Sequence, residues 1–350
     1  MRIFRHHQEV PVEARGAVVA LGNFDGVHRG HQAVIGEAAR IAQKLGAAHG
    51  VLTFEPHPRE FFKPDQPVFR LTPFRLKMRQ FEAMELDLVV VLHFDALLAR
   101  MSAEAFVVEV LGEGLGVGHV VCGYDFVFGK DRTGNAALMR EFGRVYGFGV
   151  TSVDAAQDAD GTIFSSTKVR ENLLAGDPGA AARLLGRPWE IVGRVEHGAK
   201  LGRKLDFPTA NISMAEYLQP KWGVYAVKAG IDEGTHTQWR DGVASIGVRP
   251  TVNGTSVLLE TYLFDFEGDL YNRNFRVALV EFLRPEVKFG DISLLKRQMT
   301  QDAEKARAAL AAYQGPPPGA VPPPLKLPED RFIRPDPYER ALRPRPHPPG

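Results

Sequence analysis

The chain has 350 residues, 44% of them hydrophobic, and 43 basic side chains against 42 acidic ones leave a formal charge of +1. This balance argues against nucleic acid or an anionic membrane as a partner, because both attract a concentrated basic surface. The single cysteine, Cys122, excludes an intrachain disulfide and a thiolate metal cluster, and without an apolar run of signal-peptide or membrane-span length we expect a cytoplasmic protein.

The first half alternates strand-like and helix-like segments. Apolar runs predict strands at residues 17–21, 50–54, 86–94 and 119–126. Helices are expected around residues 74–83 and 103–111, and a further helix after His31 presents Val34, Ala38, Ile41 and Leu45 on one face, with Gly46 closing it. Strands that alternate with helices indicate βαβ units, so we predict a Rossmann-like domain with a parallel sheet over residues 1–186.

The pattern changes after Gly186. Residues 189–282 form short β-rich runs separated by turns, and helical periodicity returns only at residues 292–310. Closely spaced strands without intervening helices indicate a small antiparallel barrel. We therefore predict a second domain over residues 187–313, a β-barrel followed by a C-terminal helix.

Residues 314–350 contain 13 of the 25 prolines. Such a segment buries little surface and offers few backbone donors, so we expect an extended or disordered tail. A ligand for a proline-binding partner is the alternative.

The string GNFDGVHRGH, residues 22–31, places His28 and His31 where a glycine-rich turn enters a helix. Gly22, Gly26 and Gly30 let the backbone approach a ligand closely, and the helix start suits phosphate. The imidazoles would then donate hydrogen bonds to phosphate oxygens, since the lysine of a P-loop is missing. A zinc-binding pair and histidines that only cap the helix or face water are the alternatives.

A second polar string, FSSTKVREN, covers residues 164–172. Its adjacent hydroxyls can cap a helix or bind phosphate, and Lys168 and Arg170 add positive charge. An ordinary helix cap with solvated basic side chains is the alternative. Together with the histidine loop, the string predicts a second wall for a triphosphate.

The string HGAKLGRKLDFPTAN, residues 197–211, places Thr209 and Asn211 on extended chain, where side chains two residues apart point the same way. Their oxygens suit Mg²⁺ and a nucleotide phosphate, and a polar strand edge is the alternative. Downstream, Glu260 lies in apolar, β-prone sequence, where it could take a proton from an attacking alcohol or simply face water.

The strings GNFDGVHRGH, LTFEPHP, CGYDFVFGKDRTGN and SSTKVREN resemble the nucleotidyltransferase module of bacterial bifunctional riboflavin kinase/FAD synthetases. That resemblance implies adenylylation of FMN by ATP with release of pyrophosphate. It implies that His28 and His31 are catalytic. The ATP contacts that it implies are Gly22, Asn23, Phe24, Asp25, Gly26, His28, His31, Ser165, Ser166, Thr167 and Arg170. It also implies that Asp125 and His57 contact the flavin.

PTAN, SIGVRPT, DLY and FLRPEVKF resemble the riboflavin kinase module of the same family, which folds as a small Greek-key barrel. By that resemblance Glu260 is the base that activates riboflavin, Thr209 and Asn211 hold Mg²⁺, and Arg284 and Phe289 contact the flavin. The implied ATP contacts are Gly198, Lys200, Gly202, Arg203, Thr209 and Asn211. The implied partners are therefore small molecules (riboflavin, FMN and ATP), and any homo-oligomer is expected to be transient.

Two positions depart from the family pattern, because Asp206 and Asn272 stand where the family usually has glycine. Both residue types tolerate a left-handed backbone, so the turns can survive. The charge of Asp206 predicts weaker ATP binding in the kinase module, and D206G should then lower the KM for ATP.

Three other functions stay open at this point. Only the first module could be active, as a nucleotidyltransferase for another phosphorylated acceptor. A non-catalytic flavin-binding protein would be expected to lack one of His28, His31, Thr209, Asn211 or Glu260, and all five are present. A class I aminoacyl-tRNA synthetase shares the two-histidine loop, but the chain is short and lacks a basic surface.

Overall fold

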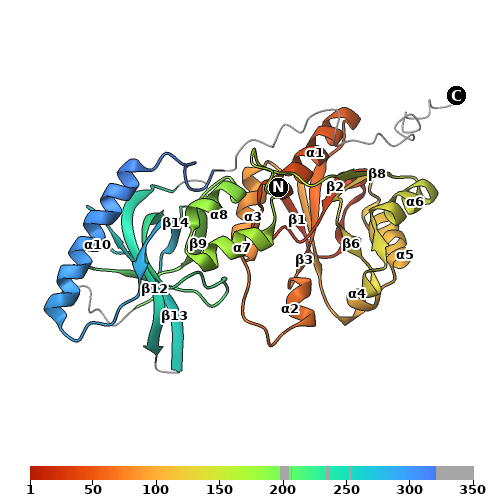
Figure 1. The fold of residues 1–350 in the computed structure, drawn as a ribbon. Helices are drawn as coiled ribbons and strands as arrows, with labels where there is room; N and C mark the ends of the chain where they lie inside the picture. The colour runs from red at the N-terminus through yellow and green to blue at the C-terminus, as the bar shows by residue number, and fades with distance from the viewer. Residues whose placement is uncertain (198–204, 206, 234–236, 252–253, 321–350) are drawn as a thin grey trace. The chain divides into compact units, whose positions relative to one another are not determined.

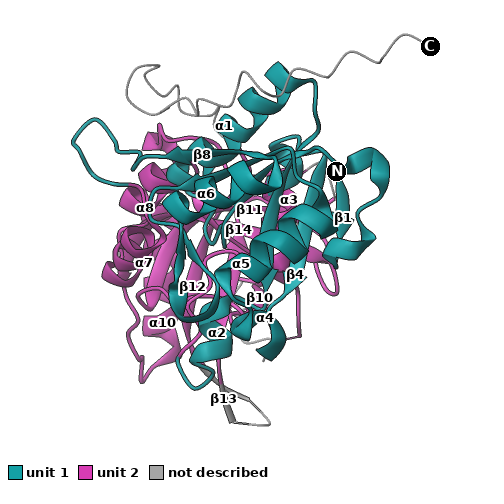
Figure 2. Ribbon diagram, turned by 90° about the vertical axis from the view of Figure 1, so that its right-hand side faces the viewer, with its two compact units in different colours: residues 1–66, 81–163, 323–350 teal, residues 67–80, 164–322 magenta. Residues whose placement is uncertain are grey.

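The computed structural model describes residues 1–197, 205, 207–233, 237–251 and 254–320 (Figure 1). The chain forms two compact units (Figure 2). The first comprises Met1–Gln66 and Phe81–Ile163, and the second comprises Pro67–Gln80 and Phe164–Pro322. Residues 321–350 lie outside the described residues. The helix α3 (Phe74–Ala83) crosses from the second unit to the first after Gln80.

The first unit is built on a six-stranded parallel sheet in the order β1-β4-β3-β2-β5-β8. The strands are β1 (Arg2–Phe4), β2 (Val18–Leu21), β3 (His49–Glu55), β4 (Leu88–His93), β5 (His119–Gly123) and β8 (Gly149–Val153). The four predicted strands are confirmed as β2 to β5, whose apolar runs are buried on both faces, as parallel strands require. The edge strands β1 and β8 were not predicted.

Helices connect these strands. They are α1 (Arg29–Leu45), α2 (Pro58–Phe62), α4 (Ala96–Arg100), α5 (Ala103–Ala105), the π-helix η3 (Phe106–Leu115) and α6 (Ala136–Tyr146), with short turns η1 (His7–Glu9), η2 (Val12–Ala14) and η4 (Lys130–Arg132) and a small hairpin β6 (Val127–Phe128) and β7 (Gly134–Asn135). Helix α1 ends where predicted, at Gly46 with a φ of +62°. Of its predicted face, Val34, Ala38 and Ile41 are buried, whereas Leu45 is exposed because it is the last residue of the helix.

The strand order places the histidine loop at a topological switch point. Strand β2 lies between β3 and β5, and the chain continues from β2 to β3 on one side but from β5 to β8 on the other, so the connections of these two neighbouring strands run in opposite directions. Ligands of open parallel sheets bind outside the carboxyl ends of the strands at such a point. The loop that follows Leu21 starts from this position.

The second unit contains a six-stranded antiparallel sheet in the order β10-β13-β12-β11-β14-β9. Its strands are β9 (Trp189–Arg194), β10 (Ala210–Ser213), β11 (Gly223–Ile231), β12 (Arg240–Thr251), β13 (Gly254–Leu263) and β14 (Asn274–Pro285). Because β14 returns to lie beside β11, the four strands β11 to β14 form a Greek key. The sheet closes towards a barrel where the backbone N–H of Glu196 donates to the carbonyl of Asn211 at 2.9 Å. The predicted Greek-key barrel is confirmed.

Helices α7 (Ser166–Ala175), α8 (Pro178–Leu185) and α10 (Ile292–Ala312) complete the second unit (Figure 1). The predicted C-terminal helix is confirmed as α10, and Ala306 and Leu310 pack in one cluster with Val224, Ala226 and Phe264 of the barrel.

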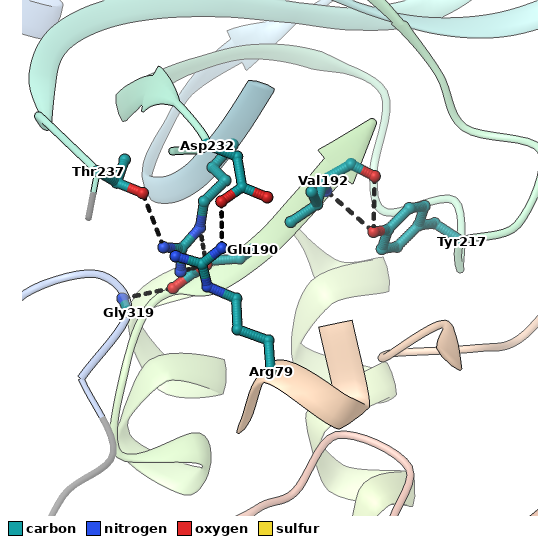
Figure 3. Close-up of polar contacts among 8 residues, drawn as sticks. Arg79, Glu190, Val192, Tyr217, Asp232, Thr237 and Gly319 are labelled. Atoms are coloured by element: carbon teal, nitrogen blue, oxygen red, sulfur yellow. Dashed lines mark hydrogen bonds and ion pairs between the residues drawn. The ribbon is translucent and has the colours of Figure 1, made fainter. Parts of the chain in front are cut away.

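Hydrogen bonds to its backbone carbonyls and an ion pair attach the segment 67–80 to the same unit. The amide of Leu218 donates to the carbonyl of Arg70 at 2.7 Å, and Trp189 Nε1 donates to the carbonyl of Leu71 at 2.9 Å. In α3, Arg79 forms an ion pair with Asp232 (Figure 3).

The first residues of the predicted tail, 314–320, are folded against the barrel. The backbone N–H of Gly319 donates to Glu190 Oε1 at 2.5 Å (Figure 3), the hydroxyl of Tyr313 donates to the carbonyl of Pro316 at 2.9 Å, and Pro318 is buried. Glu190 is itself buried and pairs with Arg276 at 2.5 Å. This segment therefore contributes to the packing of the second unit.

Candidate functional site

The loop between β2 and α1 has an unusual backbone. Phe24, Gly26 and Val27 have φ values of +50°, +87° and +42°. A positive φ is uncommon for Phe and an outlier for β-branched Val, and such strain persists only where the surroundings enforce it. Strained segments of this kind cluster at ligand-binding sites, which makes the loop the first candidate site in the molecule.

His28 and His31 lie against each other at the entrance of α1. Their rings are stacked with centroids 3.6 Å apart, and the backbone N–H of His31 donates to His28 Nδ1 at 3.3 Å. His28 therefore caps the helix, as one of the alternatives held, but it is a buried cap with only 6% of its surface exposed. Because Nδ1 accepts a hydrogen bond, a neutral His28 carries its proton on Nε2, where it is a donor.

Polar groups of neighbouring strands meet at the same edge of the sheet. Leu21 pairs with Cys122, so Asn23 and Asp125 follow adjacent parallel strands at their carboxyl ends. Thr53 Oγ1 donates to the carbonyl of Asn23 at 3.2 Å, while the buried Asn23 Oδ1 has no hydrogen-bond partner among the described residues. An orphaned buried acceptor costs free energy, which is expected where a ligand supplies the missing donor.

The other predicted residues of this region differ in accessibility. The side chains of Phe24 and Asp25 are buried, so Phe24 offers a ligand only its backbone, whereas Asp125 is exposed. His57 caps α2, because its Nδ1 accepts from the backbone N–H of Arg59 at 3.1 Å. The predicted flavin contact of His57 stays a prediction.

A cluster of aromatic rings at the carboxyl ends of β3 and β4 was not predicted. Phe61 and Phe62 of α2 each lie edge-on to Phe94, with centroids 5.5 and 5.7 Å apart, and Phe94 lies edge-on to Phe54 at 6.0 Å. Phe61 is 37% and Phe62 62% exposed, although the rings beneath them are in or against the core. The consecutive phenylalanines just after a strand are the signal that the sequence offered.

The predicted phosphate-binding hydroxyls belong to the second unit. Ser165 caps α7, since its Oγ accepts from the backbone N–H of Lys168 at 3.2 Å, and Ser166 and Thr167 occupy the first turn. Arg170 Nε donates to the carbonyl of Phe69 at 2.9 Å, and its guanidinium lies 5.1 Å from the Phe69 ring centroid. The capping interpretation of Ser165 is confirmed, and the ATP contacts of these four residues stay a prediction.

Asn211 and Glu260 share one face of the barrel. They are direct partners across β10 and β13, and Ser245 of β12 is opposite Glu260 on the other side. Cross-strand partners project to the same face of a sheet, and Thr209, two residues before Asn211, is half-buried beside β10. The buried Asn211 Oδ1 has no hydrogen-bond partner among the described residues. A hydroxyl, an amide oxygen and a carboxylate are oxygen ligands of the kind that bind Mg²⁺ together with the phosphates of a nucleotide.

Arg284 and Phe289 lie together after β14, but the guanidinium is already engaged. Arg284 Nε and Nη2 donate to the Asp302 carboxylate at 2.9 and 2.6 Å, and Nη1 donates to the carbonyl of Pro285 at 2.9 Å. The ring centroid of Phe289 is 5.9 Å from the guanidinium carbon. Asp302 of α10, which is buried and also accepts from Gln298, was not predicted, because nothing in the local sequence marks a partner 18 residues away.

Several predictions on the kinase module fall on residues outside the described ones, namely Gly198, Lys200, Gly202, Arg203 and Asp206. Asn272 is described and has a φ of +61°. The expectation that asparagine preserves the left-handed turn at this position is therefore confirmed.

None of the helices in the described ranges is long and apolar enough to cross a membrane.

Two family models match the chain, one for FAD synthetase over residues 10–168 and one for riboflavin kinase over residues 185–310. A crystal structure from Streptococcus pneumoniae titled a macrolide-efflux protein has a TM-score of 0.76 and 28% identity, and the match covers 87% of this chain and 98% of that one. This structural match supports the fold. The two activities that the family models name are also those in the names of the relatives below.

Three of these relatives are bacterial proteins named bifunctional riboflavin kinase/FMN adenylyltransferase. The protein of Pseudomonas fluorescens is 43% identical, with 89% of this chain and 98% of the relative covered. Those of Haemophilus influenzae and Escherichia coli K12 are each 39% identical, covering 84% and 83% of this chain and 94% and 92% of the relatives. The chain therefore belongs to the family of bifunctional riboflavin kinase/FMN adenylyltransferases, which makes FMN from riboflavin and FAD from FMN.

Proposed function

We propose that two separate groups of residues carry the two reactions of this family. The histidine loop of the first unit serves adenylylation of FMN, and the face of the barrel with Asn211 and Glu260 serves phosphorylation of riboflavin. Each group has its own orphaned buried acceptor, Asn23 Oδ1 in the first and Asn211 Oδ1 in the second. Each acceptor is consistent with a donor or cation supplied by a bound nucleotide complex.

In adenylyl transfer, a phosphate oxygen of FMN attacks the α-phosphorus of ATP and pyrophosphate leaves. Negative charge grows on the phosphoryl oxygens, and His28 Nε2–H, His31 and the amino end of α1 stabilise it. The protein needs no nucleophile of its own for this in-line displacement. Asn23, Asp25 and Asp125 orient the substrates from the same sheet edge.

The flavin of FMN is a planar aromatic ring system, which binds well on exposed aromatic side chains. Phe61 and Phe62 present such rings at the carboxyl ends of the strands and are held from below by Phe94 and Phe54. We assign the flavin of FMN to this cluster, in addition to the predicted Asp125 and His57.

In riboflavin phosphorylation, Glu260 takes the proton of the 5′-hydroxyl as its oxygen attacks the γ-phosphorus of ATP, and ADP leaves. Thr209 and Asn211 would hold Mg²⁺ through oxygen, which fits the orphaned Oδ1 of Asn211. The bound ion would neutralise phosphate charge. Arg284 and Phe289 lie beside α10 and contribute to flavin binding.

The observation that supports the proposal most is the direct pairing of Asn211 with Glu260 across β10 and β13. The test uses two crossed variants. Glu260→Ala should abolish FMN formation from riboflavin yet form FAD from supplied FMN, and His31→Ala should do the reverse. Flavin separation after incubation with ATP and Mg²⁺ measures both products. A folded variant that lost both activities would contradict this division.

The chain is further proposed to act in the cytoplasm on small molecules, without a nucleic-acid or membrane partner, and to self-associate only transiently. Its single, buried cysteine needs no oxidising compartment. Light scattering at increasing protein concentration, with and without ATP and flavin, measures the self-association.

A further inference from the structure

Four rings form a continuous aromatic column behind the entrance of α1. Phe81 lies edge-on to Phe24 with centroids 5.8 Å apart and an interplanar angle of 84°, and Phe24 lies edge-on to His31 at 5.2 Å and 70°. His31 is stacked on His28 at 3.6 Å and 22°. Phe81 is 0% and Phe24 1% exposed, so the column starts in the core of the first unit and ends at the histidines.

The backbone of the loop is shaped to place Phe24 in this column. Its φ of +50° is unfavourable for a residue other than glycine. Burial of the whole phenylalanine ring, which is 1% exposed, offsets that cost. Gly22 is needed beside it, because a Cβ there would lie 3.0–3.3 Å from the Phe24 ring. Two residues of the motif therefore serve to bury one ring beneath His31.

Edge-to-face contacts restrict ring orientation, because the positive edge of one ring faces the negative face of another. Phe24 thereby limits rotation of the His31 imidazole, and His31 limits that of His28 through the stacked contact. The hydrogen bond from the His31 backbone to His28 Nδ1 fixes the other side of the pair. Groups that stabilise a transition state need such support, since a displacement of about 1 Å can cost a hundredfold in rate.

We propose that Phe24 and Phe81 are positioning residues for adenylyl transfer, which hold the two imidazoles in the orientation that the ATP phosphates require. This inference rests on the proposed role of His28 and His31. Phe24 itself makes no side-chain contact with substrate, because its ring is buried. Phe81 acts one step further away, through Phe24.

The test compares Phe24→Leu and Phe81→Leu with Phe148→Leu. Phe148 is a buried ring of the first unit that packs in a core cluster without Phe24 and Phe81 and belongs to neither site, so it controls for the loss of a buried ring. FAD formation from supplied FMN is measured at varied ATP, and riboflavin phosphorylation in the same chain is the internal control. We expect kcat/KM for adenylyl transfer to fall about tenfold in Phe24→Leu and about threefold in Phe81→Leu, with little change in Phe148→Leu.

Imidazole NMR signals provide a readout that a merely structural role would not move. The signals of His28 and His31, assigned with His28→Gln and His31→Gln, should shift in both column variants and stay in place in Phe148→Leu. The proposed positioning role would be overturned if the histidine signals stayed unchanged in the Phe24→Leu and Phe81→Leu variants. It would also be overturned if kcat/KM of these variants lay within twofold of the value for Phe148→Leu. Retention of FAD formation by His31→Ala would instead overturn the proposed function, so the two failures are distinguishable. Should Phe24→Leu not fold, Phe81→Leu alone decides by the same criteria.

Discussion

Asn211 illustrates, at the scale of a single residue, a conflict between stability and function. Its buried Oδ1 has no partner among the described residues, and an unsatisfied buried acceptor costs about 1–3 kcal/mol. Asn211→Leu removes that acceptor at similar volume. We expect the melting temperature of the barrel unit to rise by about 2 °C, while riboflavin phosphorylation falls at least about 100-fold because the proposed Mg²⁺ ligand is lost. Calorimetry and flavin separation measure the two effects, and a variant that is less stable but fully active would contradict both.

Asp302 is a residue whose role follows only from the fold. Its carboxylate accepts from Nε and Nη2 of Arg284, and that guanidinium lies beside Phe289. Asp302→Asn keeps the shape but removes the charge, so the paired geometry should loosen. We expect the KM for riboflavin to rise roughly tenfold, with FAD formation from supplied FMN unchanged. Lys296→Gln on the same helix serves as the control, and equal KM values in the two variants would refute the assignment.

The sequence predicts a site better when the residues of that site lie close together along the chain. Asn211 and Glu260 lie 49 positions apart in the sequence, so only the motif resemblance indicated that they belong to one site. The structure shows that they are direct partners across β10 and β13. Within the loop, the sequence indicated the histidine pair but not that the Phe24 ring points inward, since that depends on a positive φ and on Phe81. Asp302 and the exposed rings of Phe61 and Phe62 depend on tertiary packing, which no local pattern records.

At the scale of elements, residues 314–320 are expected to stabilise the barrel although they contain no helix or strand. The Gly319 N–H donates to the buried carboxylate of Glu190 (Figure 3). Arg276, which forms an ion pair with the same carboxylate, donates to Thr237 at 3.0 Å and lies over the ring of Trp239. A chain that ends at Tyr313 should melt about 5 °C below one that ends at Ala320, because a buried carboxylate loses a donor. Scanning calorimetry of both chains measures the difference, and coincident transitions would show that the contact contributes nothing.

The same scale shows which elements a sequence predicts well. Helices α1 and α10 were indicated by apolar periodicity over many turns, and β2 to β5 by continuous apolar runs. Strand β1 has three residues and β8 begins with glycine, so neither carries such a signal. The helix after Ser102 was expected to end at residue 111 but continues as a π-helix to Leu115, because Gly112 and Gly114 weaken the periodicity without interrupting the backbone.

For the whole molecule, the assignment of two groups of residues predicts two nucleotide sites in one chain. Without flavin, neither reaction can proceed, so binding of the β,γ-imido analogue of ATP can be measured alone in the presence of Mg²⁺. Isothermal titration should give a stoichiometry of two per chain in the wild type. It should give one in Asn211→Leu and one in His31→Ala, because each variant loses the donors or ion that hold one triphosphate. The double variant should bind none, and a wild-type chain that saturates at one equivalent would mean that both reactions share a single ATP site.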